Sequence, residues 1–147
     1  MKPMAKLLAL VCAAASVGLP LARGNDTASA APAEDAALTE RGRYIANDVA
    51  MCVQCHTPRD PNGDLDDTRL FQGAPMPVES PFGRQPWATY APAIAGTGHL
   101  TDEDLRALLT TGRRTTGQAP LAPMPPFRME EPDALAVIAY LRSLPAR

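Results

Sequence analysis

The chain has 147 residues with 14 basic and 16 acidic side chains, and its formal net charge at neutral pH is −2. This length allows one domain and excludes two full-sized domains once an N-terminal leader is set aside. A slightly acidic chain has no excess of basic residues for a phosphate backbone, so we expect no nucleic-acid partner.

The first 30 residues have the composition of a secretory signal peptide. Lys2 and Lys6 form a basic start, an apolar stretch follows, and Ala28-Ser29-Ala30 matches an A-x-A cleavage site. We predict cleavage after Ala30, with Gly18 as the alternative site. The mature protein is therefore expected to be exported to the periplasm.

An uncleaved membrane anchor is the alternative to a cleaved signal peptide. The apolar run over residues 7–22 contains Pro20 and is shorter than the ~20 residues that a spanning helix needs. Cleavage would remove three basic residues and one acidic residue, which moves the net charge from −2 to −4. Of the remaining chain, we expect residues 31–37 to be a flexible lead-in and residues 38–147 to form one domain.

The first helix of this domain is predicted from Thr39 to Met51. Thr39 is the expected N-cap, with an acidic first turn. Apolar residues recur at roughly helical spacing at Leu38, Tyr44, Ile45 and Val49. A glycine inside a helix costs about 1 kcal/mol relative to alanine. Gly42 is therefore either a weak point or a place where another helix approaches closely, and we favour the close approach.

Cys52-Val53-Gln54-Cys55-His56 follows this helix directly. C-x-x-C-H is the attachment signature of a c-type haem, in which the two thiols bond to the ring and the histidine ligates the iron. Free thiols outside the cytoplasm tend to form disulfides, so covalent haem also explains this cysteine pair in an exported protein. We predict one haem c, attached through Cys52 and Cys55, with His56 as the proximal ligand.

The same pentapeptide has two other interpretations, a zinc site and a thiol redox centre. Structural zinc normally takes four ligands. The other Cys and His residues of the chain are Cys12, in the predicted signal peptide, and His99. A redox C-x-x-C usually lies near a βαβ pattern, and the surrounding sequence has none.

The segment from Thr57 to Pro92 contains seven prolines. Prolines at this density exclude a long helix or a central strand. A structureless loop of this length is unusual in a compact domain unless something organises it, and the edge of a haem would be sufficient. Within the segment, Asp60-Pro61-Asn62-Gly63 predicts a turn.

Two more helices are predicted towards the C-terminus. One is capped by Thr101, has an acidic first turn and ends at Gly112. The other begins near Pro132 and ends at Leu144, before a further proline. Because no strand pattern is evident, we expect an all-α fold in which three main helices and proline-rich loops surround one haem.

The iron needs a sixth ligand unless that position stays open. The candidate residues are Met51, Met76, Met124, Met129 and His99. Met51 directly precedes Cys52 and is expected on the proximal side of the ring. Met124 lies between two prolines, which stiffen the segment and lower the entropic cost of holding a thioether against iron. We predict Met124 as the sixth ligand and Met129 as a core residue.

With these features in place, the chain resembles the class I c-type cytochromes. It is similar, more narrowly, to bacterial periplasmic mono-haem cytochromes and to the cytochrome c subunits of membrane-associated dehydrogenases. The resemblance covers about residues 38–145 and is carried by Arg41 to Tyr44, Cys52 to Arg59, Leu70 to Pro75, Trp87 to Gly96, Pro123 to Pro125 and Asp133 to Leu141. Among these stretches only C-x-x-C-H is highly specific.

The resemblance implies how the first and last helices meet. They are expected to cross near the haem with a glycine and aromatic residues at the contact. In this chain Gly42 and Tyr44 match one side of the contact, and Tyr140 and Leu141 match the other.

The resemblance also implies residues around the cofactor. A proline carbonyl, of Pro75 or Pro77, is expected to accept a hydrogen bond from the second ring nitrogen of the proximal histidine, which would orient the imidazole. Trp, Tyr or Arg side chains are expected to meet the haem propionates, and the candidates are Trp87, Tyr90 and Arg59.

The function implied is electron transfer, with no catalytic residues of the chain's own. His/Met ligation raises the reduction potential, and the expected partners are redox proteins: a dehydrogenase, an oxidase or another cytochrome. One alternative is a haem-bearing subunit of a membrane-associated dehydrogenase or oxidase complex. Another is a haem sensor or peroxidase with an open sixth position, against which Met124 argues.

Overall fold

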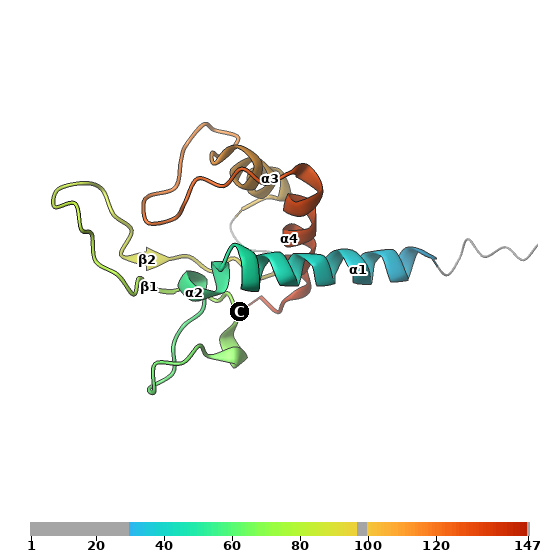
Figure 1. Ribbon diagram of the computed structural model, residues 1–147, viewed down its shortest axis with the longest axis horizontal. Helices are drawn as coiled ribbons and strands as arrows, with labels where there is room; N and C mark the ends of the chain where they lie inside the picture. The colour runs from blue at the N-terminus through green and yellow to red at the C-terminus, as the bar shows by residue number, and fades with distance from the viewer. Residues whose placement is uncertain (1–29, 97–99, 147) are drawn as a thin grey trace, which may run out of the picture.

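The computed structural model of the protein describes residues 30–96 and 100–146. Its elements are α1 (Ala30–Tyr44), η2 (Ile45–Val49), α2 (Cys52–His56), η3 (Asp67–Arg69), β1 (Ala74–Pro75), β2 (Tyr90–Ala91), α3 (Asp102–Thr111) and α4 (Glu131–Ser143). In Figure 1, α1 crosses α4, α3 lies beside α4, and long loops extend beyond α2 and the two strands. No helix in the described ranges is long and apolar enough to cross a membrane.

The first helix begins earlier than predicted. α1 begins at Ala30 and is followed directly by the π-helical turn η2, which ends at Val49. Thr39 therefore lies inside the helix and is not its N-cap, and residues 31–37 are helical although we expected a flexible lead-in. The upstream sequence is rich in alanine, the best helix former, so a helix fixed by packing in its later turns extends backwards.

The predicted close approach over Gly42 is confirmed. Gly42 is buried where α1 packs against α4. A Cβ atom at this position would overlap the backbone carbonyl of Ala136 and lie 2.9 Å from the Cβ of Tyr140. Only a glycine therefore allows the two helices to cross at this distance.

The apolar stripe predicted for the first helix is largely wrong. Leu38, Tyr44 and Val49 are 38%, 55% and 58% exposed. Tyr44 therefore does not form the expected aromatic part of the contact between the first and last helices. The buried apolar residues here are Ile45 and Ala46, both in η2.

We expect Gly42→Ala to lower the free energy of unfolding by about 1–3 kcal/mol, the usual cost of overpacking a well-packed site. Intrinsic helix propensity has the opposite sign, since alanine is better than glycine by about 1 kcal/mol. The backbone of α4 is the obstacle, and it cannot move aside as the end of a side chain could. Urea denaturation of the variant measures the change. A more stable variant would mean that α1 and α4 are not in this close contact.

Both predicted ends of α3 are confirmed. The Thr101 hydroxyl accepts a hydrogen bond from the backbone N–H of Asp104 at 3.1 Å, which caps the first turn. Gly112, with a φ of 71°, adopts the left-handed conformation at the other end, and its N–H donates to the Leu108 carbonyl at 2.9 Å. The buried residues of α3 are Leu105, Leu108 and Leu109, which lie on one face of the helix because they are three and four residues apart.

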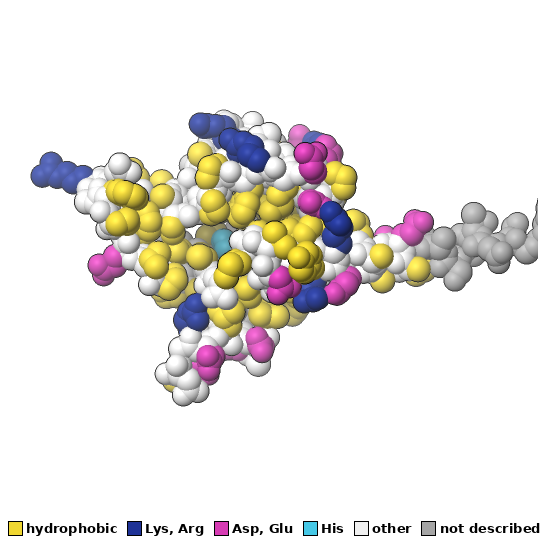
Figure 2. Space-filling view, viewed as in Figure 1, with side chains coloured by type: hydrophobic (Ala, Val, Ile, Leu, Met, Phe, Trp, Pro, Cys, Tyr) yellow, Lys and Arg dark blue, Asp and Glu magenta, His cyan; other side chains and the backbone are white. Residues whose placement is uncertain are grey.

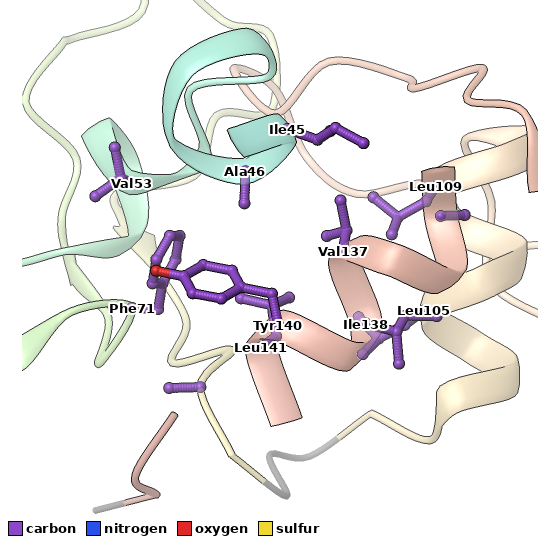
Figure 3. Close-up of a cluster of buried hydrophobic side chains, with 12 residues drawn as sticks. Ile45, Ala46, Val53, Phe71, Leu105, Leu109, Val137, Ile138, Tyr140 and Leu141 are labelled. Carbon is purple, nitrogen blue, oxygen red and sulfur yellow. The ribbon is translucent and has the colours of Figure 1, made fainter. Parts of the chain in front are cut away.

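The last helix supplies the largest share of the core. α4 begins and ends within a residue of the predicted limits, with its proline in the first turn. Figure 3 shows Val137, Tyr140 and Leu141 of α4 among side chains from η2, α2 and α3. The rings of Tyr140 and Phe71 meet edge to face with centroids 5.8 Å apart, so the loop segment after α2 is anchored to the same core.

The proline-rich segment is mostly irregular, as predicted, and its turn forms where expected. One carboxylate oxygen of Asp60 accepts hydrogen bonds from the backbone N–H groups of Asn62 and Asp64, at 2.9 Å each. The expectation of an all-α fold needs correction, because β1 and β2 pair antiparallel with Ala74 opposite Ala91. The described chain is thus mostly helical with a minimal two-stranded sheet. Strands of two residues are too short to show an alternating pattern in the sequence.

Candidate haem site

The C-x-x-C-H sequence forms a single helical turn, α2. The turn follows Met51, whose φ of 53° breaks the chain direction after η2, and the Gln54 N–H donates to the Met51 carbonyl at 3.0 Å. Residues three and four apart on a helix share a face. Cys52, Cys55 and His56 are therefore presented together on one side of the turn.

His56 is fixed in orientation by a hydrogen bond from its ring. In Figure 2 a histidine side chain lies in a hollow with mainly hydrophobic walls, and His56, which is 7% exposed, is the histidine of the described residues. Its Nδ1 lies 2.8 Å from the Pro92 carbonyl oxygen. Because a carbonyl can only accept, Nδ1 donates and Nε2 keeps its lone pair for a metal. Burial lowers the pKa of His56, which favours the neutral, metal-binding form.

Pro92 holds the position expected of Pro75 or Pro77, so that prediction is wrong. Pro75 is exposed in β1, where it pairs with Tyr90 of β2. This strand pair brings the chain after Tyr90 alongside α2 and places the Pro92 carbonyl at the His56 ring. The His56 backbone carbonyl accepts a hydrogen bond from Gly73 N–H at 2.8 Å, so residues flanking both strands support α2.

Cys52 and Cys55 are free, half-buried thiols. Burial raises the pKa of Cys52 to about 11, so this thiol is protonated at neutral pH. Two reduced thiols beside a neutral imidazole with an available nitrogen are the donor set that a covalent c-type haem requires. The residues present therefore fit this group.

The structure gives the zinc interpretation no further ligands. In residues 30–96 and 100–146, no group of three or more His, Cys, Asp or Glu side chains converges to hold a metal ion. Cys52, Cys55 and His56 share one side of α2, but they too do not converge to hold a metal ion. Because structural zinc normally takes four protein ligands, the described part of the chain supports haem attachment better than zinc binding.

The methionines differ in their surroundings. Met129 is half-buried and packs against the core, and its N–H donates to the Leu109 carbonyl at 3.0 Å. Met124 is half-buried in the loop before α4 and lies outside the core cluster. Met51 is mostly exposed at the start of α2, and Met76 is half-buried just after β1. His99 lies outside the described residues.

The Met124 loop is tied to the segment that contains Trp87. The Ala88 N–H donates to the Ala122 carbonyl at 2.7 Å, and the Met124 N–H donates to the Leu121 carbonyl at 3.2 Å. The indole N–H of Trp87 is engaged by the Val78 carbonyl at 3.1 Å. The structure therefore brings the two loops together, with Trp87 beside the loop that carries the predicted axial methionine.

Tyr90 and Arg59, the other two residues predicted near the propionates, lie in separate parts of the fold. Tyr90 is exposed in β2. The Arg59 guanidinium donates to the Gly63 carbonyl at 2.9 Å and to the Gln54 side-chain oxygen at 3.1 Å. Arg59 therefore connects the turn that follows α2 to the C-x-x-C-H sequence itself.

Two successive hydrogen bonds that the sequence did not predict connect the end of α2 to the segment that follows Pro92. The buried Thr57 hydroxyl accepts a hydrogen bond from the Phe71 N–H at 2.9 Å. The Phe71 carbonyl in turn accepts from the Ile94 N–H at 2.9 Å, two residues after Pro92. Thr57 and Phe71 both lie in stretches that carry the family resemblance, but nothing in their spacing identifies them as partners.

No protein-family model matches the chain, but two curated proteins do. The fructose dehydrogenase cytochrome subunit of Gluconobacter japonicus is 33% identical over 112 residues, which are 73% of this chain and 22% of that protein. The diheme cytochrome c-type protein of Cereibacter sphaeroides is 29% identical over 107 residues, which are 73% of this chain and 36% of that protein. The chain thus matches only about a fifth and about a third of these relatives.

Both relatives are cytochromes by name, and one of them is named as a subunit of a dehydrogenase. The C-x-x-C-H turn, with its free thiols and its oriented, buried histidine, has the chemistry that this relationship requires. Over the matched stretch the chain is similar to two proteins named as cytochromes, one of them the cytochrome subunit of a dehydrogenase.

Proposed function

We propose that the protein transfers electrons through one covalently bound haem c, with His56 and Met124 as axial ligands. The observation that carries the proposal is the α2 turn, where two free thiols accompany a buried histidine whose Nδ1 is engaged by Pro92. That arrangement leaves a single imidazole nitrogen for iron. The two cytochrome relatives support electron transfer as the role of the site.

Each residue of the site has a distinct part in this proposal. When bound, the haem would supply an iron that changes its charge by one electron. Cys52 and Cys55 would anchor the ring, and His56 would bind the proximal face. The Pro92 carbonyl holds the imidazole in one tautomer and one orientation and raises its basicity as a ligand.

Two features support Met124 as the distal ligand. Met129 is committed to the core and to a backbone bond with α3, whereas Met124 lies outside the core in a loop held by two backbone hydrogen bonds. The prolines on either side of Met124 restrict the loop further. A pre-ordered loop lowers the entropic cost of placing a thioether on iron.

We also propose export to the periplasm, with residues 1–30 as the signal peptide. The proposal is supported by the basic start, the apolar stretch and the A-x-A sequence of that segment. Of these features, only Ala30 lies in the part of the chain that the structure describes. Export fits the chemistry of the site as well, because covalent haem would keep the cysteine pair from forming a disulfide in an oxidising compartment.

The partner we propose is a dehydrogenase that delivers electrons to this haem. The relative named as a cytochrome subunit of fructose dehydrogenase supports this class of partner. An oxidase or a second cytochrome would accept the electrons, and contacts between electron-transfer partners are often below about 1,200 Å². The alternative is a bound subunit of a dehydrogenase or oxidase complex, with the same haem chemistry.

Exposure of the wild-type ferrous protein to CO tests electron transfer against sensing or peroxidase chemistry. If both axial positions are filled, the reduced protein stays low spin, and CO leaves its visible spectrum nearly unchanged. Ferricyanide should then reoxidise the haem reversibly. A high-spin ferrous protein that binds CO readily would contradict the electron-carrier proposal and favour an open sixth position.

A further inference from the structure

Residues 71–73 form a short segment that is hydrogen-bonded to the C-x-x-C-H turn and the residue after it. The Gly73 N–H donates to the backbone carbonyl of His56 at 2.8 Å. The Phe71 N–H donates to the hydroxyl of Thr57 at 2.9 Å. Thr57 is only 1% exposed, so a side chain without an acceptor at this position would leave a buried N–H unpaired, which destabilises the local structure.

The other side of the 71–73 segment holds the chain that follows Pro92. The Phe71 carbonyl accepts hydrogen bonds from the N–H groups of Ile94 at 2.9 Å and Ala95 at 3.2 Å. Phe71 is fully buried with a φ of 57°. This left-handed conformation is unusual for a bulky side chain and persists only where the surrounding structure enforces it. Contacts on both sides therefore fix the backbone of this segment between α2 and the Pro92 chain.

Gly73 determines how closely the Pro92 chain approaches the 71–73 segment. A Cβ atom at this buried glycine would lie 2.8 Å from the Ala93 nitrogen, 3.0 Å from the Ala91 oxygen and 3.1 Å from the Pro92 carbonyl carbon. All three are backbone atoms, which cannot move aside as the end of a side chain could. Any side chain larger than that of glycine would therefore push the Pro92 backbone away.

We propose that Thr57 and Gly73 are positioning residues for the proximal ligand. Through the 71–73 segment, they hold the Pro92 carbonyl at Nδ1 of His56 and thereby set the reduction potential of the iron. The proposal rests on the proposed function, because it requires haem at His56. The 2.8 Å hydrogen bond to Pro92 raises the basicity of the imidazole, and a more basic ligand favours the ferric state. Loosening this bond should therefore raise the potential.

The first test replaces the threonine hydroxyl. Thr57→Val keeps the shape of the side chain and removes the acceptor of the Phe71 N–H. We expect the reduction potential to rise, by up to about tenfold in the ferrous-to-ferric ratio, the low end of what the loss of such a partner costs in metal affinity. For one electron, tenfold corresponds to about 59 mV. Thr57→Ser keeps the hydroxyl and should restore the wild-type potential in a spectroelectrochemical titration.

A second measurement reports on the hydrogen bond itself. In the ferrous protein, NMR follows the exchange of the His56 Nδ1 proton with solvent. We expect faster exchange in Thr57→Val and wild-type exchange in Thr57→Ser. The control is Thr101→Val, which removes another threonine hydroxyl that accepts a backbone N–H, that of Asp104 in α3. It should leave both the potential and the exchange rate unchanged.

Gly73→Ala tests the close approach independently of the threonine. The added Cβ should displace the Pro92 backbone and raise the potential, as in Thr57→Val. Gly117→Ala is the matched control, because both glycines have a φ of 82°. At Gly117, no atom of the described residues lies within 4 Å of the added Cβ. The two variants therefore share the backbone strain and differ in the contact, and Gly117→Ala should keep the wild-type potential.

Three outcomes would overturn the proposal. They are an unchanged or lower potential in Thr57→Val or Gly73→Ala, a Thr57→Ser variant that behaves as Thr57→Val does, or an equal shift in Thr101→Val or Gly117→Ala. If one of the two test variants does not mature, the other decides. Failure of the proposed function looks different, because the wild-type protein would then contain no covalent haem.

Discussion

Replacing Met124 with alanine should abolish the weak near-infrared charge-transfer band that marks sulfur-to-iron ligation in the ferric protein. We also expect a lower reduction potential, because an axial thioether favours the ferrous state, and rapid CO binding by the reduced variant. Met124 lies outside the core, so its loss should change the iron far more than it changes the stability of the fold. Near-infrared absorption, potentiometry and CO binding measure these effects on one preparation.

Met129→Ala is the matched control for that experiment. Met129 packs against the core, and deleting a fully buried methionine side chain costs about 2–5 kcal/mol. Because Met129 is only half-buried, we expect a loss of stability near the lower end of that range and an intact near-infrared band. The opposite pattern, with the band lost in Met129→Ala and kept in Met124→Ala, would assign the axial role to Met129.

Cys52→Ala and Cys55→Ala should each strongly reduce or abolish the yield of mature haem protein. Each variant removes one of the two anchors, and the double variant removes both. Haem staining of a denaturing gel measures the covalent product. Gln54→Ala is the control, because it changes the residue between the anchors and leaves both thiols in place. Covalent haem in the double variant would show that attachment does not occur at α2.

Features that depend on adjacent residues could be predicted from the sequence. Thr101 and Gly112 fix the two ends of α3 through hydrogen bonds within a single turn, so their types and positions were sufficient. The same is true of C-x-x-C-H, where the spacing alone places three side chains on one face of a helical turn. Gly42 pointed to a close helix contact because a glycine lowers the stability of a helix, and a close contact with another helix is a packing reason for its presence.

Features that depend on distant segments could not be predicted. The identity of Pro92 as the partner of His56 depends on the pairing of two-residue strands, and seven prolines in that loop offered equivalent carbonyls. The start of α1 at Ala30 depends on helix extension from a packed region, for which no cap is needed.

The mass of the intact native protein under denaturing conditions tests the central claim most directly. A noncovalent haem dissociates from an unfolded chain, whereas two thioethers retain it. We expect one dominant species with the mass of the chain from Ala31 plus one haem. A polypeptide without added haem would contradict covalent attachment through Cys52 and Cys55, whatever its N-terminus proves to be.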